Sequence, residues 1–93
     1  MRVIWSPTAV RRARAAVAYI AVDRPNASKA WLDGLVERVE LLRDAPEQGR
    51  VVPEWHEETV REIQYPPYRV IYEVFEDRVE IVTLSHMRQL LDP

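Results

Sequence analysis

Apolar residues recur at intervals of three and four in the first half of the chain, a spacing typical of helices with one apolar face. The first helix is predicted to begin at Ser6-Pro7, since serine caps a helix and proline has no N–H to leave unbonded there. Asp23-Arg24-Pro25-Asn26 interrupts it, and Asn26 is expected to cap a second helix that ends at Ala45-Pro46. The short break predicts an antiparallel helical hairpin. The second helix has a broad apolar face made of Trp31, Leu32, Leu35, Val36, Val39 and Leu42.

The second half of the chain changes to β-branched and aromatic residues, which indicates strands. Breaks at Pro66-Pro67 and Glu76-Asp77 divide residues 60–88 into three strands of an antiparallel meander. Residues 3–5 form a further short strand that is expected to join the sheet. The predicted fold class is therefore α+β: a single domain over residues 1–93 with a short N-terminal strand, a helical hairpin, the three-strand meander and a short C-terminal turn. The sheet has four strands overall. Residues 47–59 are expected to be a loop in which Trp55 plugs the edge of the core.

The second hairpin also predicts which side chains share a face of the sheet. Pairing Phe75 with Arg78 across the turn places Arg69 opposite Leu84. One face then carries Arg69, Ile71, Glu73, Val82, Leu84 and His86. The other, more apolar face carries Tyr68, Val70, Tyr72, Val74, Val79, Ile81 and Thr83, and it is expected to lie against the helices.

Composition and charge narrow the class of protein. The absence of cysteine excludes disulfides and thiolate metal sites. The longest apolar run is too short to span a bilayer, and we expect a soluble cytoplasmic protein. Residues 1–45 carry seven arginines and one lysine against five acids, a balance of +3, whereas residues 46–93 carry five arginines against ten acids, a balance of −5. The strand-rich half is therefore poorly suited to gripping a phosphate backbone.

Arg69, His86 and Arg88 are the one group of residues that suggests a reaction. A histidine that transfers protons and guanidinium groups that hold a phosphate could together cleave RNA. The alternative, which the residues alone favour, is that Arg69 pairs with Glu62 or Glu73 across the strands and His86 caps the sheet. The two histidines are too few and too far apart in sequence for a metal site, and no cofactor is predicted.

The ordered set V-R-E-I at 60–63, Y-R-V-I-Y at 68–72 and H-M-R at 86–88, after a short strand and a helical hairpin, resembles the RelE/ParE superfamily. The resemblance implies a toxin of a type II toxin–antitoxin module, active either as a ribosome-dependent mRNA endonuclease or as an inhibitor of DNA gyrase. Nuclease members cluster basic residues in the strand before Y-R-V-x-Y and commonly place an aromatic or basic residue after the final arginine. Here Arg61 is the single cation in that strand, and no such residue follows Arg88. The chain is therefore more similar to the ParE branch, whose members poison gyrase.

The resemblance also implies partners and binding surfaces. The expected partners are a ParD-like antitoxin and gyrase, with no direct DNA binding unless the antitoxin is present. A toxin-like domain that has lost its toxicity and serves as a binding module remains an alternative. The expected target-binding residues are Arg61, Arg69, His86, Arg88 and Leu90; those expected to bind the antitoxin, over an apolar surface left uncovered by the hairpin, are Arg11, Arg14, Trp31, Leu35 and Val39.

Overall fold

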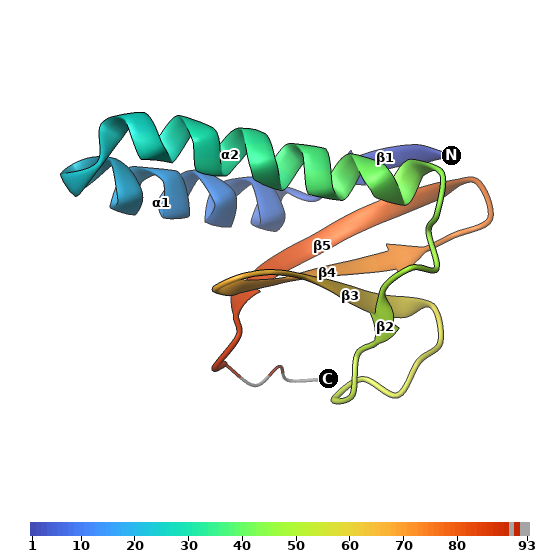
Figure 1. Cartoon of the computed structure of the whole chain (residues 1–93). Coiled ribbons are helices and arrows are strands. Elements are labelled where there is room, and N and C mark those ends of the chain that lie inside the picture. The colour runs from blue at the N-terminus through green and yellow to red at the C-terminus, as the bar shows by residue number, and fades with distance from the viewer. Residues whose placement is uncertain (90, 92–93) are drawn as a thin grey trace.

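The computed structural model describes residues 1–89 and 91. Two helices lie across one face of a five-stranded sheet, and the chain after the last strand turns to the opposite face (Figure 1). The elements in chain order are β1 (Arg2–Trp5), α1 (Pro7–Asp23), α2 (Pro25–Glu40), a 3-10 turn (Leu41–Arg43), β2 (Arg50–Val51), β3 (Val60–Tyr65), β4 (Tyr68–Val74) and β5 (Arg78–His86). The strand order is β1-β5-β4-β3-β2, with β1 parallel to β5 and the other neighbours antiparallel.

Ser6 joins the first helix to the sheet. Its Oγ accepts a hydrogen bond from the Ala9 N–H at 3.0 Å, as predicted for the cap of α1, and donates one to the Val82 carbonyl at 2.6 Å. The second bond satisfies a carbonyl of β5 just beyond the residues paired with β1. One side chain thus begins the helix and fixes its start against the last strand.

The hairpin between the helices is tighter than predicted. Arg24 alone separates α1 from α2, and the second helix begins at Pro25 without a side-chain cap. The prediction that Asn26 caps α2 is wrong, because Asn26 already lies inside the helix. Proline can begin a helix without an N–H bond, so the break needs no further residue.

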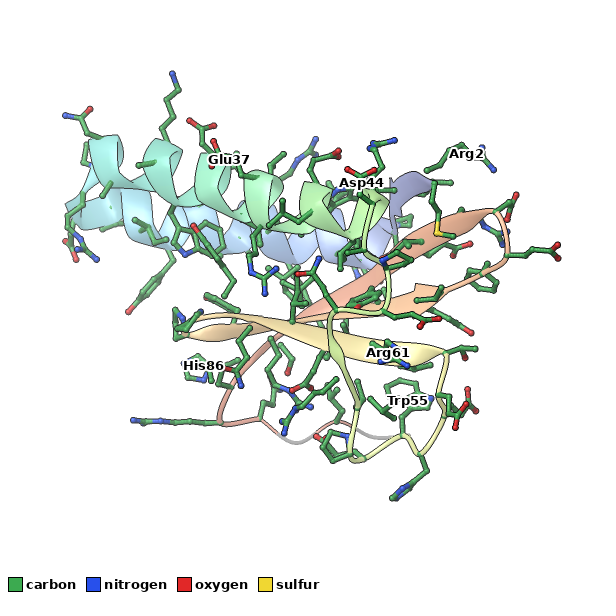
Figure 2. The ribbon with its side chains drawn as sticks, turned by 45° about the vertical axis from the view of Figure 1, so that its right-hand side comes forward. Arg2, Glu37, Asp44, Trp55, Arg61 and His86 are labelled. Atoms are coloured by element: carbon green, nitrogen blue, oxygen red, sulfur yellow. The ribbon has the colours of Figure 1, made fainter. Side chains whose placement is uncertain are left out.

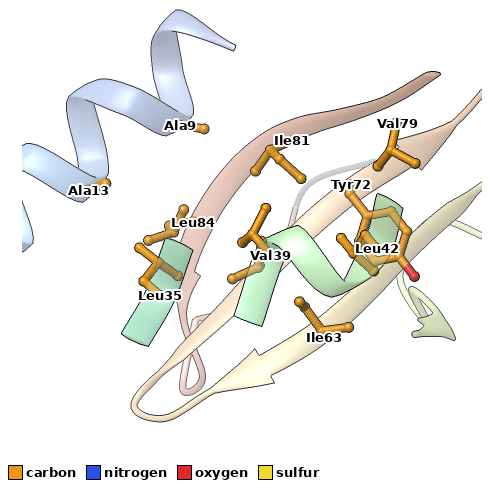
Figure 3. Packing of buried hydrophobic residues seen from close by; sticks show 11 residues of the cluster. Ala9, Ala13, Leu35, Val39, Leu42, Ile63, Tyr72, Val79, Ile81 and Leu84 are labelled. Carbon is orange, nitrogen blue, oxygen red and sulfur yellow. The ribbon is translucent and has the colours of Figure 1, made fainter. Parts of the chain in front are cut away.

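The main core lies between the helices and the sheet (Figure 3). Small residues of α1 let the helix pack closely, while the sheet-facing stripe of α2 supplies the bulk. Gly34 serves the same packing: a Cβ there would lie 2.4 Å from the Tyr65 hydroxyl, which donates to the Trp31 carbonyl at 2.7 Å. The buried residues of this core are Ala9, Ala13, Leu35, Val39, Leu42, Ile63, Val70, Tyr72, Val79, Ile81 and Leu84.

The register of β4 and β5 corrects one prediction. Val74 pairs with Val79 as expected, but an irregularity at Ile71/Tyr72 shifts the remaining pairs by one residue, so Arg69 lies opposite Ser85 instead of Leu84. The bulge turns Leu84 into the helix-facing core and moves His86 opposite Tyr68. The predicted common face for Arg69, Leu84 and His86 is therefore wrong, since an extra residue in one strand reverses the faces of all that follow.

The face away from the helices carries a second, smaller core. Val52, Val60 and Ile71 are buried there, with Trp55 and Leu91 packed against them. Trp55 therefore plugs this second core, on the side shown in Figure 2. The sheet has five strands and not four, because the two residues of β2 pair with Arg61 and Glu62 of β3. Two residues are too few to show a strand period, so the sequence did not reveal β2.

Candidate functional site

Arg69 occupies a buried ion-pair network on the helix-free face of the sheet. Its side chain is 7% exposed and lies between Glu62 on β3, whose side chain is 1% exposed, and Glu54 in the loop after β2. Arg69 Nε donates to Glu62 Oε2 at 2.8 Å, and Nη2 donates to the same oxygen. Arg50 contacts the other oxygen of Glu62 at 2.8 Å. The cross-strand pairing of Arg69 with Glu62 is thereby confirmed.

The contacts of Arg69 account for all of its hydrogen-bonding capacity. Nη1 donates to Glu54 Oε2 at 2.8 Å and to the Gln89 carbonyl at 3.3 Å, while Nη2 donates to Glu54 Oε1 at 2.9 Å as well as to Glu62. With the Nε bond, the five N–H donors of the guanidinium all have partners. Hydrogen bonding to Glu54 raises the pKa of Arg69 further above its ordinary value. No donor of Arg69 is left for an incoming phosphate.

Glu54 is the functional candidate that sequence reasoning missed. Its carboxylate receives both Nη atoms of Arg69 and also the Leu91 N–H at 3.0 Å. The hydrogen bond from Arg69, followed by that from Leu91, lowers the pKa of Glu54 to about 2. The available signal was Arg69 itself, because an arginine within an apolar strand requires carboxylate partners. Nothing in the sequence singled out Glu54 among the acids of its loop.

The other residues expected to bind a target are dispersed. His86 is exposed at the end of β5; its ring lies edge-on to Tyr68 at 5.9 Å, and its Nδ1 accepts the Arg88 N–H at 3.2 Å. Arg61 donates to the carbonyls of Gly49 at 2.9 Å and Glu47 at 3.4 Å, so it holds the loop before β2. Figure 2 labels both Arg61 and His86. Arg88 is exposed beyond β5, and Leu90 lies outside the described residues. The structure therefore does not bring Arg69, His86 and Arg88 together on one face.

A second candidate surface is an apolar groove between the two helices. It has a volume of about 340 Å³ and is lined by Trp5, Val10, Ala13, Arg14, Val17, Ala18, Leu32 and Val36. Arg11 and Arg14 border an adjoining hollow that shares Trp5 and Val10. We predicted that the helical hairpin leaves part of its apolar surface uncovered. The groove is such a surface, and it has cations at its rim.

The apolar stripe of α2 is divided between this groove and the core. Leu35 and Val39, both expected to contact an antitoxin, are fully buried in the core against the sheet and have no exposed surface, whereas Leu32 and Val36 line the groove. Trp31 packs at the edge of the core with its ring centroid 5.6 Å from those of Tyr65 and Tyr68. Of the residues expected to bind an antitoxin, Arg14 lines the groove and Arg11 lines the adjoining hollow.

Two further features bear on function. In the part of the chain that the structure describes, no three His, Cys, Asp or Glu residues are placed to hold a metal ion. No helix over the same residues is long and apolar enough to cross a membrane.

Comparison with known proteins identifies the fold and the family. A solved structure described as the chromosomal ParDE TA system from P. aeruginosa superposes with a TM-score of 0.78 at 20% sequence identity, covering 92% of this chain and 95% of the other. The comparison with curated proteins finds no match. Residues 3–91 match the family model for the ParE toxin of the type II toxin–antitoxin system parDE. The chain belongs to the ParE toxin family, which confirms the resemblance noted in its sequence.

Proposed function

We propose that this ParE-family protein acts in the cytoplasm as a toxin that inhibits DNA gyrase and is neutralised by a ParD-like antitoxin. The observation that carries the choice of target is the network around Arg69. An endonuclease of this superfamily requires cations free to bind RNA phosphate. Here Arg69, the arginine that the sequence offered for holding a phosphate, is surrounded by two carboxylates and has no free donor.

The rest of the helix-free face supports the same choice. Around Arg69, strand β3 presents Glu62 and Gln64, which lie opposite Ile71 and Arg69. His86, the proton-transfer candidate of the sequence analysis, lies opposite Tyr68 on the other face of the sheet. A phosphate at Arg69 would lie against the carboxylates of Glu54 and Glu62, which is electrostatically unfavourable, and the neighbouring Arg50 is itself paired with Glu62 at 2.8 Å.

Parallel target assays test this function. Purified protein is added to a gyrase supercoiling reaction and to a translation reaction, and primer extension is performed on ribosome-bound transcripts after induction without antitoxin. We expect loss of supercoiling and no new 5′ ends. Codon-linked cuts that vanish in Arg69→Ala would replace gyrase inhibition with mRNA cleavage. Antitoxin binding without either effect would indicate a non-toxic binding module.

The groove between the helices suits the antitoxin. An amphipathic helix could place apolar side chains over Leu32 and Val36 and acidic side chains beside Arg11 and Arg14. The description of the related solved structure, a ParDE system, supports a ParD-like partner. A segment that orders on binding would cover this apolar surface.

Charge reversal tests the position of the antitoxin. Arg11→Glu/Arg14→Glu should slow association more than it speeds dissociation, because charges at a rim act mainly by steering. Arg24→Glu/Lys29→Glu is the matched control: it makes the same change in net charge at two exposed positions that do not line the groove. Stopped-flow binding to the co-expressed antitoxin should show a smaller effect for the control. Equal slowing by both variants would argue against the groove.

A further inference from the structure

The C-terminal segment, residues 87–89 and 91 of the described chain, is held to the sheet at two separate places. At its start, the Met87 N–H donates to the Pro67 carbonyl at 2.8 Å and the Gln89 N–H donates to the His86 carbonyl at 2.8 Å. Further along, Arg69 donates to the Gln89 carbonyl at 3.3 Å and Glu54 accepts the Leu91 N–H at 3.0 Å. The ion pair makes both of these backbone contacts, and Ser85 Oγ adds a hydrogen bond to Gln89 Oε1 at 3.3 Å.

We propose that Glu54 and Arg69 form a clamp that positions the C-terminal segment for contact with the toxin's target. Arg69 is then a positioning residue: its guanidinium holds the C-terminal segment and does not bind a phosphate. The inference rests on the proposed function for the identity of the target, but the clamp itself is a property of this chain.

The division of contacts makes Glu54 the adjustable side of the clamp. Glu62 receives Nε and Nη2 of Arg69 from within the sheet and is almost fully buried, so it fixes the guanidinium independently of Glu54. Glu54 comes from a loop, and its side chain is 18% exposed. A change at Glu54 therefore weakens the hold on Leu91, while Glu62 keeps the guanidinium of Arg69 in place in β4.

The clamp also explains how exposed groups near the C-terminus could be presented in one arrangement. His86 and Arg88 are exposed, and Met87 is 39% exposed. Leu91 adds an apolar attachment by packing against the second core. A surface held in one arrangement before binding loses less conformational freedom when it binds.

Glu54→Gln is the variant that tests the clamp while leaving the rest of the fold in place. One carboxylate oxygen of Glu54 accepts from Arg69 Nη1 and the Leu91 N–H, and the other accepts from Arg69 Nη2. Glutamine has one oxygen and one NH₂ group where glutamate has two oxygens. In either orientation of the side chain, its NH₂ group therefore lies against at least one of these N–H groups. Glu58→Gln, an exposed position in the same loop, is the matched control for loss of one negative charge.

Hydrogen exchange gives a readout that does not depend on the target. With Glu54→Gln we expect the Leu91 amide to exchange about tenfold faster, since its hydrogen bond to a carboxylate is replaced at best by a weaker bond to a neutral amide oxygen, while amides of β4 and β5 exchange as in the wild type. Glu58→Gln should leave the Leu91 amide unchanged. Unchanged exchange at Leu91 in Glu54→Gln would overturn the clamp.

The gyrase assay then tests the role of the clamp. Glu54→Gln should need about tenfold more protein for half-inhibition, in proportion to the loss of the ordered segment, and should bind the antitoxin within about twofold of wild type. In protein truncated after Arg88, adding Glu54→Gln should change gyrase inhibition less than about twofold, because two changes that act through one segment are not additive. Full potency of Glu54→Gln, or an undiminished effect of Glu54→Gln in the truncated protein, would overturn the positioning role. Wild-type protein that leaves gyrase active would instead remove the proposed target, and the exchange result would still decide whether the clamp exists.

Discussion

Replacing Arg69 by methionine removes the cation at the centre of the helix-free face while keeping a side chain of similar length. Glu62 would then remain as a nearly inaccessible carboxylate, since its side chain is 1% exposed. Removing one partner of a buried ion pair costs about 3–5 kcal/mol. Arg50 still contacts Glu62 at 2.8 Å, and Glu54, 18% exposed, can turn toward water. Both facts favour the lower end of this range, so we expect Arg69→Met to lower the free energy of unfolding by about 3 kcal/mol.

Urea unfolding at neutral pH measures this loss, because a domain of this size is suited to two-state treatment. Arg69→Met/Glu62→Gln removes the isolated charge as well and should recover at least about 1 kcal/mol relative to Arg69→Met. Arg88→Met is the matched control at an exposed position, where a change within about 0.5 kcal/mol is expected. A loss below about 1 kcal/mol in the single variant, or a double variant no more stable than the single, would refute the account of Arg69 as part of a buried network.

Three further predictions concern close contacts and acid stability. Gly34→Ala should destabilise the wild type, because its Cβ would lie 2.4 Å from the Tyr65 hydroxyl, yet it should stabilise Tyr65→Phe by up to about 1 kcal/mol through helix propensity; thermal unfolding that shows the same sign in both backgrounds would contradict this. Tyr72→Phe should cost about 1–3 kcal/mol in urea unfolding, because the Gly49 N–H donates to the buried Tyr72 hydroxyl at 2.9 Å, and a neutral result would show that the N–H finds another acceptor. The pKa of Glu54 is lowered from 4.5 to about 2, so the ionised carboxylate contributes fully to stability above its unfolded-state pKa, and this contribution is lost as the pH falls toward 2. The difference in unfolding free energy between wild type and Glu54→Gln should therefore narrow as the pH falls over that range. A constant difference would show that the ionisation of Glu54 is not its source.

Features that depend on neighbours in sequence were predictable. The spacing of apolar residues placed both helices, Ser6 was recognised as a cap, and the alternation before the bulge assigned Val70, Tyr72, Val79 and Ile81 to the helix-facing core. Each of these follows from local geometry, since the periods of helices and strands act over a few residues. The ordered motifs likewise sufficed for the family, because they span nearly the whole chain.

The arrangement of the candidate sites depended on contacts between segments far apart in sequence. Glu54 meets Arg69 and Leu91 only because the loop after β2 folds beneath β4, and no local pattern marks that encounter. The burial of Leu35 and the exposure of Leu32 in the groove depend on where α1 and the sheet lie against α2.

The sequence by itself determined the helices, the strands of the meander, the α+β class and the resemblance to the toxin family. Tertiary structure decided the fifth strand, the side of the sheet on which His86 lies, and the partners that occupy every donor of Arg69. The physical reason is the range of the interactions. Periodicity and capping are short-range and are written in adjacent residues, whereas a one-residue bulge or a buried charge is settled by whichever distant groups the completed fold brings within hydrogen-bonding distance.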